Sequence, residues 1–184
     1  HMTLFYQNET AEENIHRYSV KIEGCCDGSS FCYEEKLWFN SGQISFTVDK
    51  PSLWWPRGRG RSALYDAEFT LLYDGEIRDS RKIRFGIRTA ELDYRPITES
   101  DDGEFCFRIN GERIFIRGTN WVVADALHSR DSYRIDKMLK LVCETNCNMI
   151  RCWGGSVYED HDFFDKCDEY GIMVWQDFVM GCGL

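Results

Sequence analysis

The feature that most constrains the fold of this chain is a change in hydrophobic periodicity between residues 90 and 104. Before this change, short segments alternate apolar and polar residues, the period-two pattern typical of half-buried antiparallel strands. These segments are residues 17–24, 43–49, 63–75 and 81–87. Asp74-Gly75 lies between two of them and predicts a tight hairpin turn. Because no helical pattern interrupts them convincingly, residues 1–90 are predicted to form an immunoglobulin-like β-sandwich.

A different pattern follows the sandwich. Residues 91–113 are expected to form a linker and a hairpin, because Asn110-Gly111 separates two short apolar segments. Residues 114–184 then alternate strand-like and helical segments in the order β-α-β-α-β. The strand-like segments are residues 114–118, 148–153 and 172–178. Strands that alternate with helices predict a parallel sheet with right-handed crossovers.

The two predicted helices carry start and stop signals. Asp131 precedes the first helix and Asp160 precedes the second, and both are suited to cap the exposed backbone amides of a first helical turn. Gly171 follows the second helix, where glycine accommodates a left-handed turn. The first helix has an apolar stripe at Ile135, Met138, Leu139 and Val142, and the second at Phe163, Cys167 and Tyr170.

Polar and aromatic residues occur where the parallel strands are predicted to end. In a (β/α)8 barrel, functional residues collect at the carboxyl ends of the strands. The residues in these positions are Thr119, Asn120, Trp121, Arg151, Trp153, Gln176 and Asp177. Two other polar residues receive a simpler interpretation: His128 is expected to be an exposed loop residue, and Glu159 to favour the adjacent helix N-terminus.

Charge and hydropathy exclude two kinds of partner. The formal net charge is -9, from 31 acidic and 22 basic residues, which argues against the broad basic surface of a nucleic-acid-binding protein. No apolar segment approaches the roughly 18 residues needed to cross a membrane. Neither nucleic acid nor membrane is therefore expected as a partner.

The cysteines bear on the compartment and on metal binding. There are nine, an odd number, and no CxxC pair occurs among them. This pattern favours a reducing, cytoplasmic location over a disulfide framework; secretion or periplasmic export with a removed signal is the alternative. Cys143 and Cys147 are one helical turn apart, but no second pair completes four ligands, so no metal and no cofactor is expected.

A loop rich in tryptophan and arginine interrupts the sandwich pattern. In PSLWWPRGRGR, residues 51–61, two prolines bracket Trp54 and Trp55, and three arginines alternate with two glycines. One interpretation is a carbohydrate-binding module in which the two tryptophans form a sugar-stacking platform. The other is a structural one, in which they fill the end of the sandwich or a domain interface.

Several motifs resemble glycoside hydrolase family 2, most closely its β-mannosidase branch. These motifs are KPSLWWPRGRGRSALYDAEFTL, FGIRT, GTNWVVADAL and NMIRCWGGSVYEDHDFFDKCDEYGIMVWQDF. Members of that family are retaining exo-glycosidases with a jelly-roll domain, an immunoglobulin-like sandwich and a (β/α)8 catalytic barrel. The resemblance therefore implies a multi-domain β then α/β fold: the sandwich, followed by an incomplete (β/α)8 barrel with three of its strands.

The resemblance also implies a substrate class and its contacts. A terminal β-mannosyl residue of a glycoside or oligosaccharide is the expected substrate, with β-galactosides and β-glucuronides as alternatives. Trp153 and Asp177 are the leading candidates for substrate binding, followed by Trp121, Asp125 and Arg151. The family's two catalytic glutamates belong to later barrel strands and are expected beyond Leu184, so this chain is predicted to hydrolyse no glycoside.

Three parallel strands without the rest of a barrel would leave apolar surface and strand edges uncovered. Self-association, or poor order in the C-terminal third, is therefore expected for the chain alone.

Overall fold

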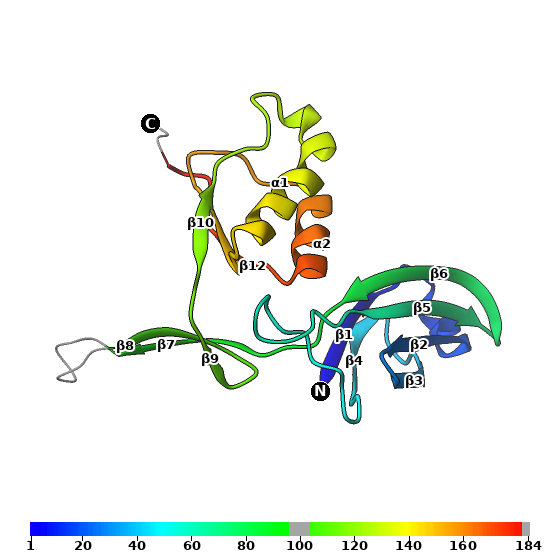
Figure 1. Ribbon diagram of the computed structural model, residues 1–184. Helices are drawn as coiled ribbons and strands as arrows, with labels where there is room; N and C mark the ends of the chain where they lie inside the picture. The colour runs from blue at the N-terminus through cyan, green and yellow to red at the C-terminus, as the bar shows by residue number, and fades with distance from the viewer. Residues whose placement is uncertain (96–103, 182–184) are drawn as a thin grey trace. The chain divides into compact units, whose positions relative to one another are not determined.

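The computed structural model describes residues 1–95 and 104–181, which form two compact units (Figure 1). The first unit comprises His1–Ser52 and Leu64–Ile87, and the second comprises Leu53–Ala63 and Arg88–Leu184. The loop of residues 53–63 thus belongs to the second unit, although the sequence places it between strands of the first.

The first unit consists of antiparallel strands in two sheets. One sheet pairs β1 with β4, and the other has the order β3-β2-β5-β6. A 3-10 helix, Glu12–Arg17, joins the first two strands. The strands are β1 (Met2–Gln7), β2 (Tyr18–Cys26), β3 (Ser29–Lys36), β4 (Ser41–Phe46), β5 (Tyr65–Tyr73) and β6 (Glu76–Phe85).

The hairpin predicted at Asp74-Gly75 is confirmed. Tyr73 pairs with Glu76, and the two turn residues have φ angles of +49° and +83°, the left-handed region that a two-residue hairpin turn requires. Asp27-Gly28 forms an equivalent turn between β2 and β3 that the sequence interpretation did not include.

Aromatic side chains join the two sheets of the first unit. The rings of Phe31 and Tyr33 on β3 lie 5.4 and 5.6 Å from the ring of Phe46 on β4, measured between centroids. Ile22 and Tyr65 are fully buried in the same unit. Burial of such side chains between two layers is the main stabilising term in a sandwich, and the predicted β-sandwich is confirmed.

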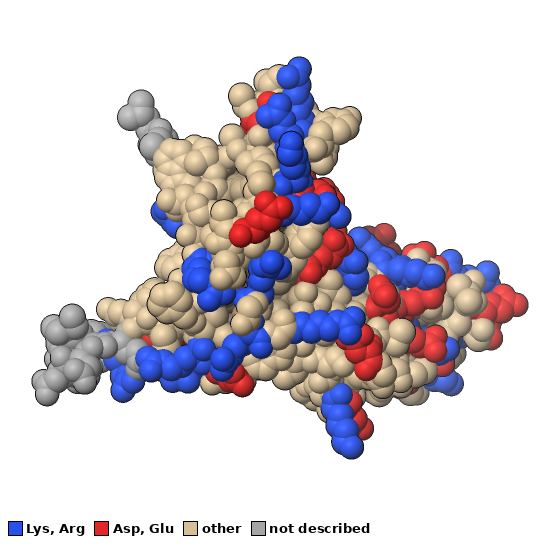
Figure 2. All heavy atoms as spheres, viewed as in Figure 1, with Lys and Arg blue, Asp and Glu red and all other residues tan. Residues whose placement is uncertain are grey.

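The surface of the first unit is mixed in charge. Figure 2 shows Lys and Arg side chains interspersed with Asp and Glu over the part of this unit that is in view. Ion pairs link Arg17 to Asp74 and Lys21 to Glu23. Both pairs are exposed to solvent, so they contribute little to stability.

The second unit begins with an antiparallel sheet of β7 (Ala90–Arg95), β8 (Glu104–Ile109) and β9 (Glu112–Ile114). The hairpin predicted at Asn110-Gly111 is confirmed, because Ile109 pairs with Glu112 across a turn with φ angles of +52° and +79°. A parallel sheet follows, formed by β10 (Gly118–Trp121), β11 (Met149–Cys152) and β12 (Met173–Gln176).

Helices alternate with these parallel strands, as predicted. A short 3-10 helix, η2 (His128–Arg130), and α1 (Ser132–Glu144) connect β10 to β11, and α2 (His161–Tyr170) connects β11 to β12. Across the described residues, no helix combines the length and hydropathy needed to cross a lipid bilayer.

The first parallel strand starts later than predicted. The expected strand was residues 114–118, but Ile114 pairs with Phe107 in the preceding hairpin, and the parallel ladder begins only at Gly118, opposite Met149. The buried side chain of Asn148 accounts for the gap. Its amide donates to the carbonyl of Phe115 at 3.0 Å and accepts from the amide of Arg117 at 2.9 Å, in place of ladder hydrogen bonds.

Both predicted helix caps occupy the expected positions but do not make the expected hydrogen bonds. Neither the side-chain oxygens of Asp131 nor those of Asp160 accept a hydrogen bond from a backbone amide of the helix that follows. Instead both carboxylates face His128. Gly171 ends α2 with a φ of +69°, as predicted.

The two helices pack on one face of the parallel sheet and form the core of the second unit. The predicted stripes are confirmed: Ile135 and Leu139 of α1 and Phe163 and Cys167 of α2 are buried there. Burial raises the pKa of the Cys152 thiol to about 12, and burial also raises the pKa of the Cys167 thiol.

The loop of residues 53–63 packs against the end of α2. Trp54 is 1% exposed and donates its indole N–H to the carbonyl of Asp168 at 2.8 Å, while the guanidinium of Arg88 lies 4.6 Å from its ring. The backbone of Arg57 donates to the carbonyl of Gly171 at 2.7 Å. Because its faces are covered, Trp54 cannot provide the sugar-stacking platform that was considered, and the structural interpretation of this loop is favoured.

Buried and exposed thiols should differ in reactivity, because alkylation requires an accessible thiolate. With iodoacetamide at pH 8, Cys25 and Cys32, which are exposed, should be modified in the native protein. Cys143, Cys152 and Cys167, which are buried, should be protected. Peptide mapping by mass spectrometry measures this, with urea-unfolded protein as the control in which all five react. Native-state labelling of Cys167 at the rate of Cys25 would contradict the described core.

Replacing Trp54 with alanine should lower the free energy of unfolding by about 3–5 kcal/mol, because a large buried side chain is lost and a cavity remains. Trp38→Ala is the matched control, since Trp38 is 65% exposed, and its effect should be much smaller. Urea unfolding followed by circular dichroism compares the two variants. Equal effects would show that Trp54 is not part of the core.

Candidate functional site

An ion pair joins the carboxyl ends of the parallel strands. Arg151 on β11 binds Asp177, just beyond β12, through two contacts: Nη2 to Oδ2 at 2.6 Å and Nε to Oδ1 at 3.3 Å. On the other side, Arg151 Nη1 donates to Oδ1 of Asn120 on β10 at 3.3 Å. The contact between Arg151 and Asn120 forms because the register of β10 and β11 places these two residues directly beside each other. One guanidinium thus connects the ends of all three strands.

The carboxylate of Asp177 has a third donor. The backbone N–H of Gly154 donates to Oδ2 at 3.2 Å, and the N–H of Asp177 continues the ladder to the carbonyl of Cys152 at 3.1 Å. Charge-assisted and backbone hydrogen bonds together hold the carboxylate in one position. The two side chains remain partly open to solvent, with 44% of Arg151 and 21% of Asp177 exposed.

Trp153 is placed by the turn that follows β11. Its backbone N–H donates to the carbonyl of Trp121 at 3.0 Å, so parallel pairing continues one residue beyond the strand. Its own carbonyl accepts from the backbone N–H of Ser156 at 3.1 Å. The half-buried indole lies against Gly155, where a Cβ atom would collide with the ring. At Gly154, a Cβ atom would lie 2.5 Å from the carbonyl oxygen of Phe178. Both glycines are therefore required by close approach.

Trp121 lies on the opposite face of the sheet. It is 4% exposed, it packs against Phe163 with ring centroids 5.0 Å apart, and its indole N–H donates to Oε1 of Glu159 at 2.7 Å. Successive side chains of a strand point to opposite faces. The side chains of Asn120 and Trp121 therefore lie on opposite faces of the sheet: Asn120 contacts Arg151, and Trp121 lies in the helix-covered core.

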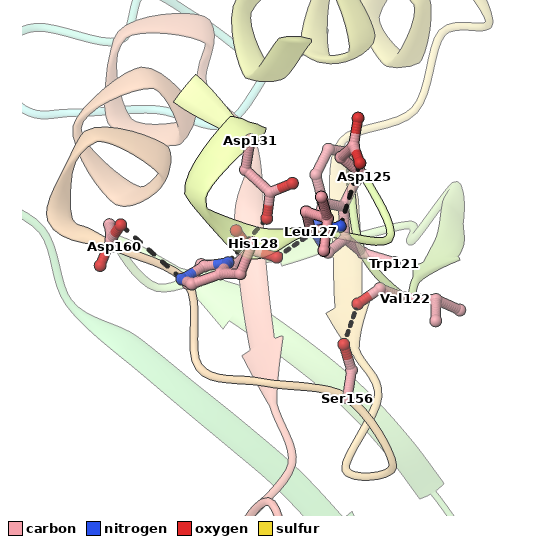
Figure 3. A network of polar contacts seen from close by, with 9 residues as sticks. Trp121, Val122, Asp125, Leu127, His128, Asp131, Ser156 and Asp160 are labelled. Atoms are coloured by element: carbon pink, nitrogen blue, oxygen red, sulfur yellow. Dashed lines mark hydrogen bonds and ion pairs between the residues drawn. The ribbon is translucent and has the colours of Figure 1, made fainter. Parts of the chain in front are cut away.

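Asp125 also belongs to the helix side. Its Oδ1 accepts the N–H of Leu127 at 3.0 Å (Figure 3). Its Oδ2 lies 3.1 Å from Nη2 of Arg134 on α1. Its side chain is 9% exposed. These contacts anchor the loop after β10 to α1. Of the five predicted substrate-binding residues, the structure brings Arg151 and Asp177 into contact and places Trp153 in the turn directly after β11. Trp121 and Asp125 lie apart from them on the helix side.

A second polar cluster lies at the starts of the helices and was not anticipated. His128 is half-buried rather than exposed; its Nδ1 lies 2.7 Å from Oδ2 of Asp131, and its Nε2 lies 3.7 Å from Oδ2 of Asp160 (Figure 3). The neighbouring Asp131 carboxylate raises the pKa of His128. Glu159 is buried, and this burial raises the pKa of its carboxyl group. No sequence motif marks this cluster, because its residues come from separate loops.

Comparison with known proteins identifies relatives of both units of the chain. The family described as glycosyl hydrolases family 2 matches residues 6–88, which lie mostly in the first unit. Beta-mannosidase B of Aspergillus fumigatus is 38% identical over 185 residues, covering 99% of this chain and 21% of the relative. Beta-mannosidase of Capra hircus is 42% identical over 132 residues, covering 71% of this chain and 15% of the relative.

Solved structures show the same relationship. The crystal structure of β-D-mannosidase from Dictyoglomus thermophilum matches 96% of this chain and 24% of that one, with a TM-score of 0.71 and 29% sequence identity. The chain belongs to glycosyl hydrolase family 2. Within that family it is β-mannosidase-like, and it spans about a fifth of the length of the curated relatives that it matches.

Gly154→Ala should destabilise the second unit by roughly 1–3 kcal/mol, because the added Cβ meets backbone that cannot move away as a flexible side chain could. Val157→Ala, in the same loop and 40% exposed, is the control and should have a smaller effect. Urea unfolding monitored by circular dichroism gives both values. A stability of Gly154→Ala equal to that of the unmodified chain would contradict the close contact with Phe178.

Proposed function

We propose that this chain is the sandwich and the beginning of a (β/α)8 catalytic barrel in a retaining exo-glycosidase that removes terminal β-mannosyl residues. Support comes from the parallel β-α-β-α-β segment and from relatives named β-mannosidases over nearly all of the chain. The observation that carries the proposal is the Arg151–Asp177 pair at the carboxyl edge of the parallel sheet, which also binds the backbone of Gly154 in the turn after Trp153.

The chemistry of these three side chains suits a pyranose. A sugar ring presents a patch of C–H groups on one face and hydroxyl groups at its edge. The indole of Trp153 provides an apolar surface, and Asp177 and Arg151 provide an acceptor and donors whose positions are fixed by the strand ends. Their role in the proposed enzyme is to bind and orient the sugar.

Catalysis requires further groups. Retaining glycosidases use two carboxyl groups about 5 to 5.5 Å apart, one as nucleophile and one as acid and base. Asp177 is occupied by a guanidinium and a backbone amide, an arrangement suited to accepting hydrogen bonds from hydroxyl groups. We therefore assign it to binding and propose that the catalytic glutamates lie on strands beyond Leu184, so that this chain alone has no hydrolytic activity.

The identity of the sugar, self-association of the chain and its cellular location also belong to the proposal. Structures described as a β-glucuronidase and a β-galactosidase share the fold, with TM-scores of 0.66 and 0.65 at 21% and 17% identity, which keeps β-glucuronides and β-galactosides as alternative substrates. Self-association and a cytoplasmic location stay predictions. Phe105, Phe115 and Trp175 have large exposed apolar surfaces that would favour association.

A chimaera tests the function. This chain replaces the matching segment of Aspergillus fumigatus beta-mannosidase B, and hydrolysis of aryl β-mannoside, β-galactoside and β-glucuronide is measured. We expect β-mannosidase activity in the chimaera, a loss of at least 100-fold in kcat/KM with Trp153→Ala or Asp177→Ala, and no turnover by the 184-residue chain.

Trp38→Ala is the control, because this exposed tryptophan lies in the first unit, and its kcat/KM should stay within twofold of the chimaera's. Turnover of any of the three glycosides by the purified chain would refute the assignment of catalysis to later strands. Unchanged kcat/KM in folded Trp153→Ala and Asp177→Ala chimaeras would refute the assignment of the site.

A further inference from the structure

The second polar cluster has the composition of a cation site. His128 precedes α1, Asp131 is the residue immediately before that helix, and Glu159 lies two residues before α2. One nitrogen or oxygen from each of the three lies within 4.8 Å of the others. Glu159 is more than 25 residues from His128 and Asp131 along the chain. It meets them because both helices pack on the same face of the sheet.

The burial of this cluster leaves two carboxylate oxygens without partners. Asp131 is 2% exposed and Glu159 is 7% exposed. Asp131 Oδ2 binds His128 and Glu159 Oε1 binds Trp121, but Asp131 Oδ1 and Glu159 Oε2 are buried and have no hydrogen-bond partner among the described residues. An unpaired buried carboxylate oxygen is costly, so each is expected to have a ligand.

Within residues 1–95 and 104–181, the charges around the cluster are not balanced. His128 is the basic group that faces the two buried carboxylates, and a third carboxylate, Asp160, faces the same imidazole from the solvent side (Figure 3). Arg134, on α1 nearby, is paired with Asp125. Even with a protonated imidazole the cluster carries excess negative charge, which a divalent cation would neutralise.

We propose that His128, Asp131 and Glu159 bind one divalent cation of the Mn²⁺ or Zn²⁺ class. One imidazole with two carboxylates is a ligand set that such ions accept, whereas the nitrogen ligand disfavours Ca²⁺ and Mg²⁺. Two ligand atoms each about 2.1 Å from a metal are at most about 4.2 Å apart, so the cluster needs to contract only slightly.

Such a cation would act as a structural clamp. It would join the loop after β10 and the starts of both helices to Glu159, which holds the indole of Trp121. The carbonyl of Trp121 in turn accepts the N–H of Trp153. This inference does not rest on the proposed glycosidase function.

Mn²⁺ is the suitable probe, because the exposed cysteines would also take up Zn²⁺. The 184-residue chain is freed of metal with a chelator and titrated with Mn²⁺, and the free ion is measured by its electron paramagnetic resonance signal. We expect one Mn²⁺ per chain and a Tm that rises with its concentration. Absence of binding at millimolar Mn²⁺ would overturn the proposal. The cluster would then be a hydrogen-bonded network without a bound cation.

Variants locate the ion. His128→Ala and the nearly isosteric Asp131→Asn should each weaken Mn²⁺ binding at least tenfold and abolish the rise in Tm, while His161→Ala, at an exposed histidine in the first turn of α2, should do neither. Circular dichroism verifies that each variant is folded. If His128→Ala does not fold, Asp131→Asn decides, and Mn²⁺ binding of undiminished affinity in that variant would show that the ion binds elsewhere.

Discussion

The register of three short parallel strands is the constraint on which the candidate site depends. Because β10, β11 and β12 run in the same direction, their carboxyl ends meet at one edge, and the pairing of Asn120 with Arg151 puts a guanidinium between neighbouring strand ends. Asp177 then completes the bidentate pair from the third strand. A shift of one residue would turn Arg151 into the apolar core and expose Cys152, so burial of the helix-covered face protects the site geometry.

The turn after β11 converts this register into a surface suited to a sugar. Gly154 and Gly155 allow the backbone and the indole of Trp153 to approach more closely than any side chain would permit, and the amide of Gly154 becomes available to Asp177. The turn after β11 therefore both redirects the chain and forms part of the candidate site. The positions of Trp153 and Asp177 are coupled through backbone contacts, and this rigidity is what a binding site for a small, hydroxyl-rich ligand requires.

Much of the architecture was accessible from local patterns, because each pattern reports an interaction between near neighbours. Asp74-Gly75 and Asn110-Gly111 predicted hairpins from backbone preference alone, and Gly171 predicted a helix end. The start of β10 was missed because the buried amide of Asn148, distant in sequence, takes the backbone groups of residues 115–117. Trp54 was ambiguous for a similar reason, since the acceptor of its indole N–H, the carbonyl of Asp168, lies more than 100 residues away.

By itself, the sequence determined the alternation of strands and helices after residue 113, the family, and the residues at the strand ends, because alternation, turn chemistry and motifs are local properties. Only the tertiary structure decided which of those residues share a surface. Trp121 is the last residue of β10 and Trp153 directly follows β11, yet the first is enclosed by the helices and the second is half-buried in the turn whose Gly154 amide binds Asp177. Strand parity and helix packing separate them, and the same packing brings His128 and Glu159 together, because burial and charge balance depend on contacts between distant segments.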